Sequence, residues 1–161
     1  MDLPPIILDQ LIAHVEQAEG FRAEAYHCPA GYLTIGYGHR VDGPMGPISR
    51  MQAEDLLRAD LGRVYRETLE LAPELREHPG PLAALMDLIY TTGPAAVRGT
   101  QTLEAFRRGA WREAAIRYRR WVYAHVGGRP TRLPGLVTRR DRAARLWLDP
   151  LATNPSGGLK A

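Results

Sequence analysis

A change of pattern at residue 21 constrains the fold of this chain more than any other feature of its sequence. Residues 6–18 place apolar side chains at helical spacing. From residue 21 to residue 47, glycines and prolines interrupt the chain, and between them stand Tyr26, Tyr32, Leu33, Ile35 and Tyr37. This segment predicts short antiparallel strands around a tight turn at residues 29–31. Such a sheet is too small to fold alone.

The residues after this segment predict helices. Ser49 and Gln52 match a capping box, and apolar residues at helical spacing continue to about Leu71. Beyond a proline-rich break, further helices are expected at residues 82–91, 102–108, 111–126 and 136–148. We expect their tryptophans to lie in the hydrophobic core, namely Trp111, Trp121 and Trp147.

These elements predict an α+β fold in a single domain at residues 1–150. Its parts are a β-lobe at about 20–48, a connecting helix at about 49–71 and a helical lobe at about 82–148. Residues 151–161, rich in glycine and turn-forming residues, are expected to form a flexible tail.

The residue inventory excludes several catalytic chemistries. The single lysine, Lys160, lies in a glycine-rich tail, so we expect neither a Schiff-base lysine nor a Walker phosphate loop. Neither serine of the 161 residues stands in a Gly-x-Ser-x-Gly elbow. A single cysteine, Cys28, leaves no internal disulfide and no multi-cysteine zinc site. The five histidines have no metal-ligand spacing, so no metal and no cofactor is expected.

Charge is distributed unevenly along the chain. Residues 1–80 hold seven arginines against thirteen acidic residues, whereas residues 81–161 carry a net charge of +9. The basic half suits an anionic polymer such as nucleic acid or a bacterial envelope, and the alternative is that its helices are simply solvated. No nucleic-acid-binding motif is present, so we expect no nucleic-acid partner. No stretch suits membrane insertion or a signal peptide, which predicts synthesis in the cytoplasm.

The candidate chemistry lies where the first helix meets the sheet. Glu19 ends the amphipathic helix beside Phe21, and a half-buried carboxyl at that place suits a general acid. The sheet folding back across the helix end would bring Cys28 and Thr34 to the same cleft, between sheet and helical lobe. The alternative is that Glu19 is an ordinary solvated carboxylate.

The spacing Glu19-x8-Cys28-x5-Thr34, followed by Ile-Gly-Tyr-Gly-His at residues 35–39, resembles the phage-type lysozymes, the muramidase endolysins of glycoside hydrolase family 24. Later landmarks follow in the family's order, at residues 49–54, 84–93, 102–103, 120–122 and 135–140. The likeness spans about residues 6–148. It implies a lysozyme-like fold, in which a long helix joins a small sheet lobe to a helical lobe.

The resemblance implies hydrolysis of the β-1,4 bond between N-acetylmuramic acid and N-acetylglucosamine, and thus bacterial cell lysis. Glu19 would protonate the leaving oxygen, and Thr34 would orient a water on the opposite sugar face. Most relatives carry aspartate where this chain has Cys28. A neutral thiol would stabilise the developing cation poorly, whereas a thiolate could activate water (an inverting route) or attack the anomeric carbon (a retaining route). The alternative function is a lysozyme-like wall-binding or structural subunit with weak or no catalysis.

Other roles are also implied by the resemblance. Tyr90, Thr91 and Thr102 would bind substrate, although many relatives carry an amide at the position of Thr91. The alternative for Tyr90 is a place in the helical core. His39 would form a structural ion pair with Asp60. The expected partner is peptidoglycan, reached in the periplasm by a monomer with the help of a holin or of delivery on a particle. The arginines at 139 and 140 are expected on a solvated helix face, and the alternative is that they contact the acidic stem peptides.

Overall fold

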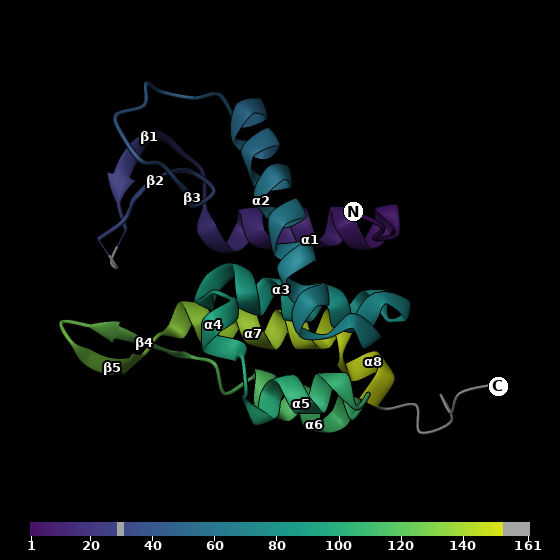
Figure 1. Ribbon diagram of the computed structural model, residues 1–161. Helices are drawn as coiled ribbons and strands as arrows, with labels where there is room; N and C mark the ends of the chain where they lie inside the picture. Colours follow the sequence, from purple (N-terminus) through teal and green to yellow (C-terminus); the bar gives the residue numbers. More distant parts are fainter. Residues whose placement is uncertain (29–30, 153–161) are drawn as a thin grey trace.

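The computed structural model describes residues 1–28 and 31–152 (Figure 1). Helix α1 (Pro5–Glu19) ends at Gly20 and leads into a three-stranded antiparallel sheet of β1 (Arg22–His27), β2 (Leu33–Gly36) and β3 (His39–Arg40), in the order β1-β2-β3. Thr34 pairs with Tyr26 across β1 and β2 and with Arg40 across β2 and β3. The expected strands are confirmed, while residues 29–30 of the expected turn lie outside the described residues.

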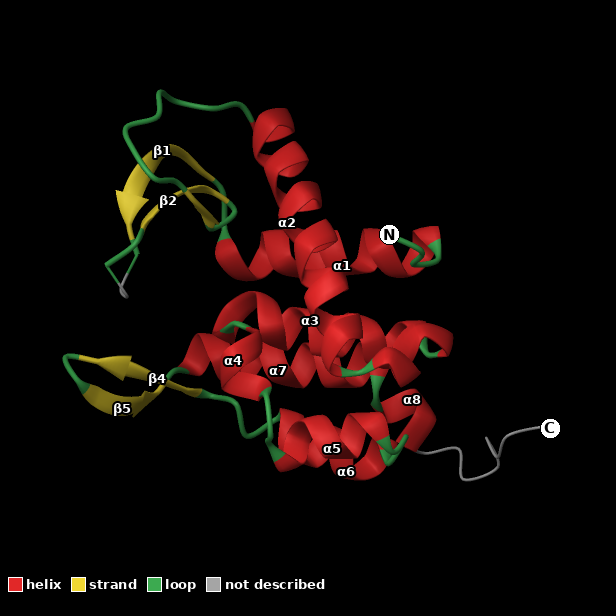
Figure 2. Cartoon of the chain, in the orientation of Figure 1, coloured by secondary structure: helices red, strands yellow, loops and turns green. Residues whose placement is uncertain are grey.

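Helix α2 (Arg50–Leu71) connects the sheet to the other helices (Figure 2). The capping box at its start is confirmed: the Gln52 amide donates to the Ser49 hydroxyl at 3.2 Å, and the Ser49 amide donates to Gln52 Oε1 at 2.8 Å. Both bonds satisfy amide groups that have no partner inside the helix. The long connecting helix therefore begins where the sequence predicts.

The helical lobe is built around α3 (Pro79–Thr92), in which every residue from 81 to 89 is buried. The surrounding elements are η1 (Pro73–Glu77), α4 (Pro94–Val97), α5 (Gln101–Arg107), α6 (Trp111–Tyr118), α7 (Pro134–Trp147) and α8 (Asp149–Ala152). One buried hydrophobic cluster joins α1, the sheet and α2 to this lobe. The mixed α+β fold with a small antiparallel sheet is as expected.

The expected helix at residues 111–126 is wrong in its second half. Helix α6 stops at Tyr118, and a hairpin follows, formed by β4 (Tyr123–Val126) and β5 (Arg129–Arg132). Its two-residue turn is Gly127-Gly128, with φ of +56° and +78°. Glycine pairs with positive φ are strongly favoured in two-residue hairpin turns, and this local signal overrides the helical spacing of the apolar residues.

The expected tail also begins too early. Leu151 and Ala152 belong to α8, while residues 153–161 lie outside the described residues. Among the described residues, no helix has the length and apolar character needed to cross a membrane.

Gly36 fixes how closely the sheet approaches α2, and Gly36→Ala is expected to lower the free energy of unfolding by about 2–3 kcal/mol. Gly36 has φ +65°, and an added Cβ would lie 3.0 Å from Ala53 Cβ in α2. Thermal or urea unfolding measures the change. Gly62→Ala is the control, because Gly62 lies within α2 with open space around it, and it should stabilise by up to about 1 kcal/mol. Equal midpoints for Gly36→Ala and wild type would contradict the close approach.

Candidate active site

A cleft of about 730 Å³ is lined by residues of the sheet on one side and of α7 and the β4–β5 hairpin on the other. Its lining includes Glu19, Cys28 and Thr34 together. The three residues come from the end of α1, the end of β1 and the middle of β2, because β2 folds back antiparallel to β1. The structure thus places the three candidate catalytic residues on one concave surface.

Glu19 presents a fixed carboxylate to this cleft. Its side chain is 26% exposed, and Arg139 Nη1 donates to Glu19 Oε1 at 2.5 Å. Gly38, with φ +89°, lies on the other side, where an added Cβ would be 3.6 Å from Oε2. No hydrogen bond from a described residue reaches Oε2. One oxygen is therefore held by a guanidinium and the other is left for a ligand.

Arg139 is itself held by a buried carboxylate behind it. Asp87 on α3 is 0% exposed and accepts from Arg139 Nε at 2.7 Å and from Arg140 Nη1 at 2.5 Å. The Tyr118 hydroxyl donates to the same carboxylate at 2.6 Å. The expected solvated position of both arginines is therefore wrong, because α7 turns them inward onto a carboxylate supplied by α3.

Burial by itself raises the pKa of Asp87, but the charge of Arg139, the His14 imidazole 3.4 Å away and the charge of Arg140 bring that pKa well below its usual range. Asp87 is thus ionised at neutral pH and fixes both guanidinium groups. Removal of either arginine would leave part of this buried charge unpaired and lower the stability of the protein. The chain Asp87–Arg139–Glu19 connects the core of the helical lobe to the cleft.

Thr34 and Cys28 face the cleft from the sheet. Thr34 is 4% exposed, and its hydroxyl donates to the Tyr26 carbonyl at 3.2 Å, which leaves its oxygen lone pairs to accept. The Cys28 backbone is fixed by hydrogen bonds with Tyr32 and Gly31, and its side chain is partly exposed. The sheet therefore supplies one oriented hydroxyl and one accessible thiol.

The three expected substrate-binding residues are not brought to one place. Tyr90 and Thr91 line the cleft, but Thr102 does not. The Tyr90 hydroxyl donates to the Tyr37 carbonyl at 2.8 Å, and burial and then the Glu19 charge raise the pKa of that hydroxyl. The Thr91 hydroxyl donates to the Leu88 carbonyl and accepts a hydrogen bond from Arg140. Thr91 is thus engaged with the protein.

Thr102 lies on α5, outside the cleft, and its hydroxyl accepts a hydrogen bond from the Trp121 indole at 3.0 Å. Trp121 is half-buried and lines the cleft. Thr102 therefore acts on the cleft indirectly, because it orients the Trp121 ring that lines the cleft. Trp147, by contrast, is 2% exposed, as expected of a core residue.

His39 and Asp60 join the sheet to the connecting helix. His39 Nδ1 lies 2.9 Å from Asp60 Oδ2, between β3 and the middle of α2. This contact holds the turn that carries Gly38, and hence the backbone beside Glu19, in place. Neither His39 nor Asp60 lines the cleft itself.

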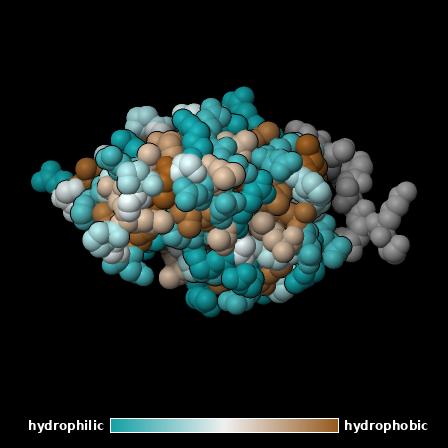
Figure 3. Space-filling model, turned by 90° about the horizontal axis from the view of Figure 1, so that it is seen from above, coloured by the Kyte–Doolittle hydropathy of each residue, from teal (hydrophilic) through white to brown (hydrophobic). Residues whose placement is uncertain are grey.

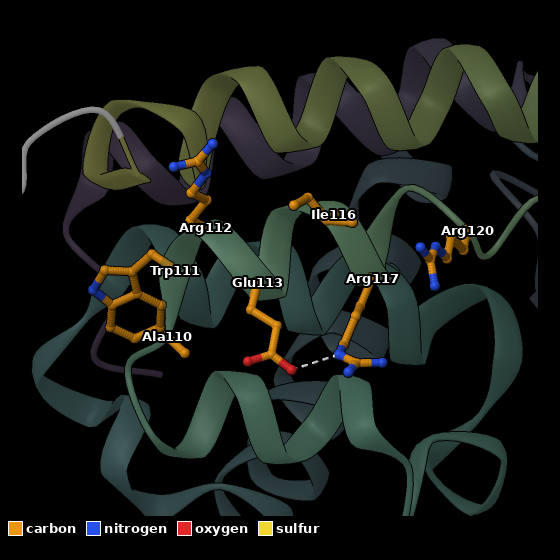
Figure 4. Close-up of a pocket in the computed structure, with 7 residues that line it drawn as sticks. All are labelled: Ala110, Trp111, Arg112, Glu113, Ile116, Arg117 and Arg120. Atoms are coloured by element: carbon orange, nitrogen blue, oxygen red, sulfur yellow. Dashed lines mark hydrogen bonds and ion pairs between the residues drawn. The ribbon is translucent and has the colours of Figure 1, made fainter.

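A second, smaller pocket of about 510 Å³ beside α6 lacks a carboxylate that is free to act as an acid (Figure 4). Its carboxylate, Glu113, is bonded to Arg117 at 2.7 Å, and this hydrogen bond lowers the pKa of Glu113. Glu113 Oε2 also accepts a hydrogen bond from Arg108 at 3.2 Å, so neither oxygen of this carboxylate is left for a ligand, in contrast to Glu19. Among the described residues, no group of His, Cys, Asp and Glu side chains has the geometry of a metal site.

Sequence reasoning missed several residues of the cleft. The sequence predicts a helix at Tyr123 and His125 and a solvated face for Arg139, yet all three residues line the cleft. The Gly127-Gly128 pair was the available signal for the hairpin. No local signal marks Arg139, because its partner Asp87 is 52 residues away along the chain.

Known proteins are similar to this chain over most of its length. The phage lysozyme family model matches residues 16–143. The endolysin of Acyrthosiphon pisum secondary endosymbiont phage 1 is 31% identical over 134 residues, which cover 83% of this chain and 91% of the relative.

Two solved structures are similar at 26% identity. The endolysin from Escherichia coli O157:H7 phage FAHEc1 has a TM-score of 0.78, covering 93% of this chain and 95% of that one. The muramidase domain of SpmX from Asticaccaulis excentricus has a TM-score of 0.75, covering 86% and 95% respectively. With a matching family model, a relative above 30% identity and the same fold, this chain belongs to the phage lysozyme family.

Proposed function

We propose that Glu19, Cys28 and Thr34 carry out the reaction of this chain. As a phage lysozyme the chain is a peptidoglycan muramidase, which hydrolyses the β-1,4 bond between N-acetylmuramic acid and N-acetylglucosamine. The observation that carries the residue assignment is that all three line one cleft between the sheet and the helical lobe.

Glu19 is the proposed general acid. Cleavage of a glycosidic bond requires a proton on the leaving oxygen while positive charge develops at the anomeric carbon. Arg139 fixes Oε1, so the carboxyl cannot rotate freely, and Oε2 is left facing the cleft to carry the proton. Preorganisation of this kind reduces the entropy lost in reaching the transition state.

Thr34 and Cys28 are proposed to hold the attacking water on the opposite face of the sugar. Because the Thr34 hydroxyl proton is committed to the Tyr26 carbonyl, its oxygen is left to accept a hydrogen bond from that water. Cys28 lines the same cleft, and its side chain, as the thiolate, would take the proton that the water loses on attack. This arrangement predicts inversion, and hence an α-anomeric product. Direct attack by Cys28 would instead give the β-anomer, since retention needs a covalent intermediate.

Cys28→Ala is expected to lower kcat/KM on peptidoglycan by about 10²-fold, whereas Cys28→Asp should retain most of the activity because a carboxylate also accepts a hydrogen bond from water. Thr34→Ala is expected to cost a similar factor. Thr138→Ala is the matched control, because that hydroxyl is exposed on α7 and bonds only to the Pro134 carbonyl. Turbidity clearing measures the rates, and proton NMR of fresh product identifies the anomer. Wild-type rates for Cys28→Ala, or a β-anomer, would contradict the water-holding role.

We also propose that the chain acts as a monomer and that a holin, or delivery on a particle, brings it from the cytoplasm to the wall. One chain supplies every residue proposed for catalysis. Hydrophilic and hydrophobic residues are mixed on the face of the molecule seen from above (Figure 3). Size-exclusion chromatography with light scattering tests the monomer. Lysis of an expressing bacterial culture only after a pore-forming protein is added tests the dependence on delivery.

A further inference from the structure

We propose that Arg40, stacked on Tyr32, and the exposed Tyr123 of the β4–β5 hairpin form a binding site for the acidic peptide stem of peptidoglycan. These three residues line the same cleft as the catalytic residues. This proposal rests on the proposed function, because it adds substrate recognition to the same cleft.

Arg40 is a preorganised cation with free donors. Its guanidinium carbon lies 3.7 Å from the centroid of the Tyr32 ring, and both residues are exposed and line the cleft. Within residues 1–28 and 31–152, no acidic side chain pairs with Arg40. Stacking on an aromatic face leaves the planar edge of a guanidinium available, and that edge matches the two oxygens of a carboxylate.

The other arginines that line the cleft are already neutralised. Arg139 is paired with Glu19 and Asp87, and Arg140 is paired with Asp87. Among the described residues of the lining, Arg40 is therefore the arginine whose charge is not paired with an acidic side chain. A cleft with this balance favours an anionic group close to Arg40.

The hairpin supplies the opposite side of the site. Tyr123, Ala124 and His125 of β4 line the same cleft as Arg40, and Tyr123 is 62% exposed. The hairpin projects from the helical lobe on the side of the molecule where the sheet lies (Figures 1 and 2). An exposed tyrosine there adds nothing to the core, but its ring offers a flat apolar face and a polar tip to a ligand.

The chemistry of the substrate selects the stem as the occupant. The hydroxyl and acetamide groups of the glycan backbone carry no charge, whereas the short peptides attached to muramic acid carry free carboxylates. An unpaired arginine beside the catalytic residues therefore matches the stem better than the sugar rings. Tyr123 would pack against the apolar parts of the same stem.

The test compares glycan strands that keep their peptides with stripped strands, from which an amidase has removed the peptides and in which the lactyl carboxylates exposed by that cleavage have been converted to amides. For Arg40→Gln, the ratio of kcat/KM on peptide-bearing strands to kcat/KM on stripped strands is expected to fall about tenfold relative to wild type. Arg129→Gln is the control, because Arg129 is an exposed arginine on the hairpin that does not line the cleft, and its ratio should equal that of wild type. An unchanged ratio for Arg40→Gln, or an equal fall for Arg129→Gln, would overturn the proposal.

A binding measurement separates this proposal from the proposed catalysis. In a Glu19→Gln background, co-sedimentation with insoluble peptidoglycan should weaken about tenfold on adding Arg40→Gln, and should weaken clearly on adding Tyr123→Ala. Sedimentation with amidase-treated material whose lactyl carboxylates have been amidated should not distinguish the Arg40 variants. If wild type cleaves neither substrate but this binding pattern is found, the catalytic assignment fails and the stem site stands. If cleavage occurs and binding ignores Arg40, the stem site fails alone.

Discussion

Glu19→Gln is expected to lower the rate of peptidoglycan hydrolysis by about 10³- to 10⁴-fold while the protein remains folded. General acid catalysis contributes factors of this order, and an amide cannot donate the proton that the leaving oxygen needs. The amide oxygen can still accept the hydrogen bond that Arg139 gives to Oε1 in the wild type. The loss should therefore fall on kcat, with little change in the affinity for peptidoglycan.

The measurement is turbidity clearing of purified peptidoglycan, combined with co-sedimentation to report binding. Glu16→Gln is the matched control, because Glu16 lies one turn earlier on α1 and does not line the cleft. It should clear peptidoglycan at the wild-type rate. Activity of Glu19→Gln within tenfold of wild type would show that another group supplies the proton.

Asp87→Asn is expected to lower the free energy of unfolding by about 3–5 kcal/mol, more than Gly36→Ala. The substitution removes the carboxylate that pairs with two buried guanidinium groups, Arg139 and Arg140, whose side chains are 5% and 1% exposed. Activity should fall as well, because Arg139 loses the partner that aims it at Glu19. Urea unfolding and the clearing rate measure the two effects.

The stability of Asp87→Asn should also respond differently to acid. The pKa of Asp87 in the folded protein lies well below its unfolded value of about 3.9. Its contribution is therefore complete above that value and is lost as the pH falls below it, toward the folded pKa. Wild type should begin to lose this contribution below about pH 4 and should go on losing it as the pH falls further, and the variant should lack that part of the slope. Parallel pH profiles for the two proteins would contradict the role assigned to Asp87.

Glu113→Gln serves as the control for Asp87→Asn. Glu113 is also paired with arginines, Arg108 and Arg117, but on the surface of α6, where solvent screens the interaction. Its melting temperature should match that of wild type. A comparable loss in both variants would mean that burial is not what makes the Asp87 cluster important.

The parts of the structure that the sequence predicted depend on short-range patterns. The capping box at Ser49 and Gln52 and the glycine-rich strands before it involve residues close together in the chain. The spacing of Glu19, Cys28 and Thr34 was informative because one helix end and one hairpin bring all three together. The family resemblance extended the same kind of pattern to the order of the helices.

The parts that escaped prediction depend on long-range pairing or on competition between local signals. Asp87 meets Arg139 and Arg140 only because α3 and α7 pack together, and an arginine pair in a basic helix gives no indication of that partner. The hairpin was missed because apolar residues at helical spacing were given more weight than Gly127-Gly128. Thr102 illustrates a third case, because its hydroxyl orients a cleft residue, Trp121, from outside the cleft.

Mass spectrometry of the products that the wild-type protein releases from purified peptidoglycan tests the central claim most directly. Hydrolysis with Glu19 as the acid and a water held at Cys28 and Thr34 predicts muropeptides that end in reducing N-acetylmuramic acid and have gained one water per cleavage. Products that end in 1,6-anhydro-muramic acid would mean a transglycosylase reaction without an attacking water. Release of no product by protein that still sediments with peptidoglycan would contradict catalysis at this cleft and leave a wall-binding protein.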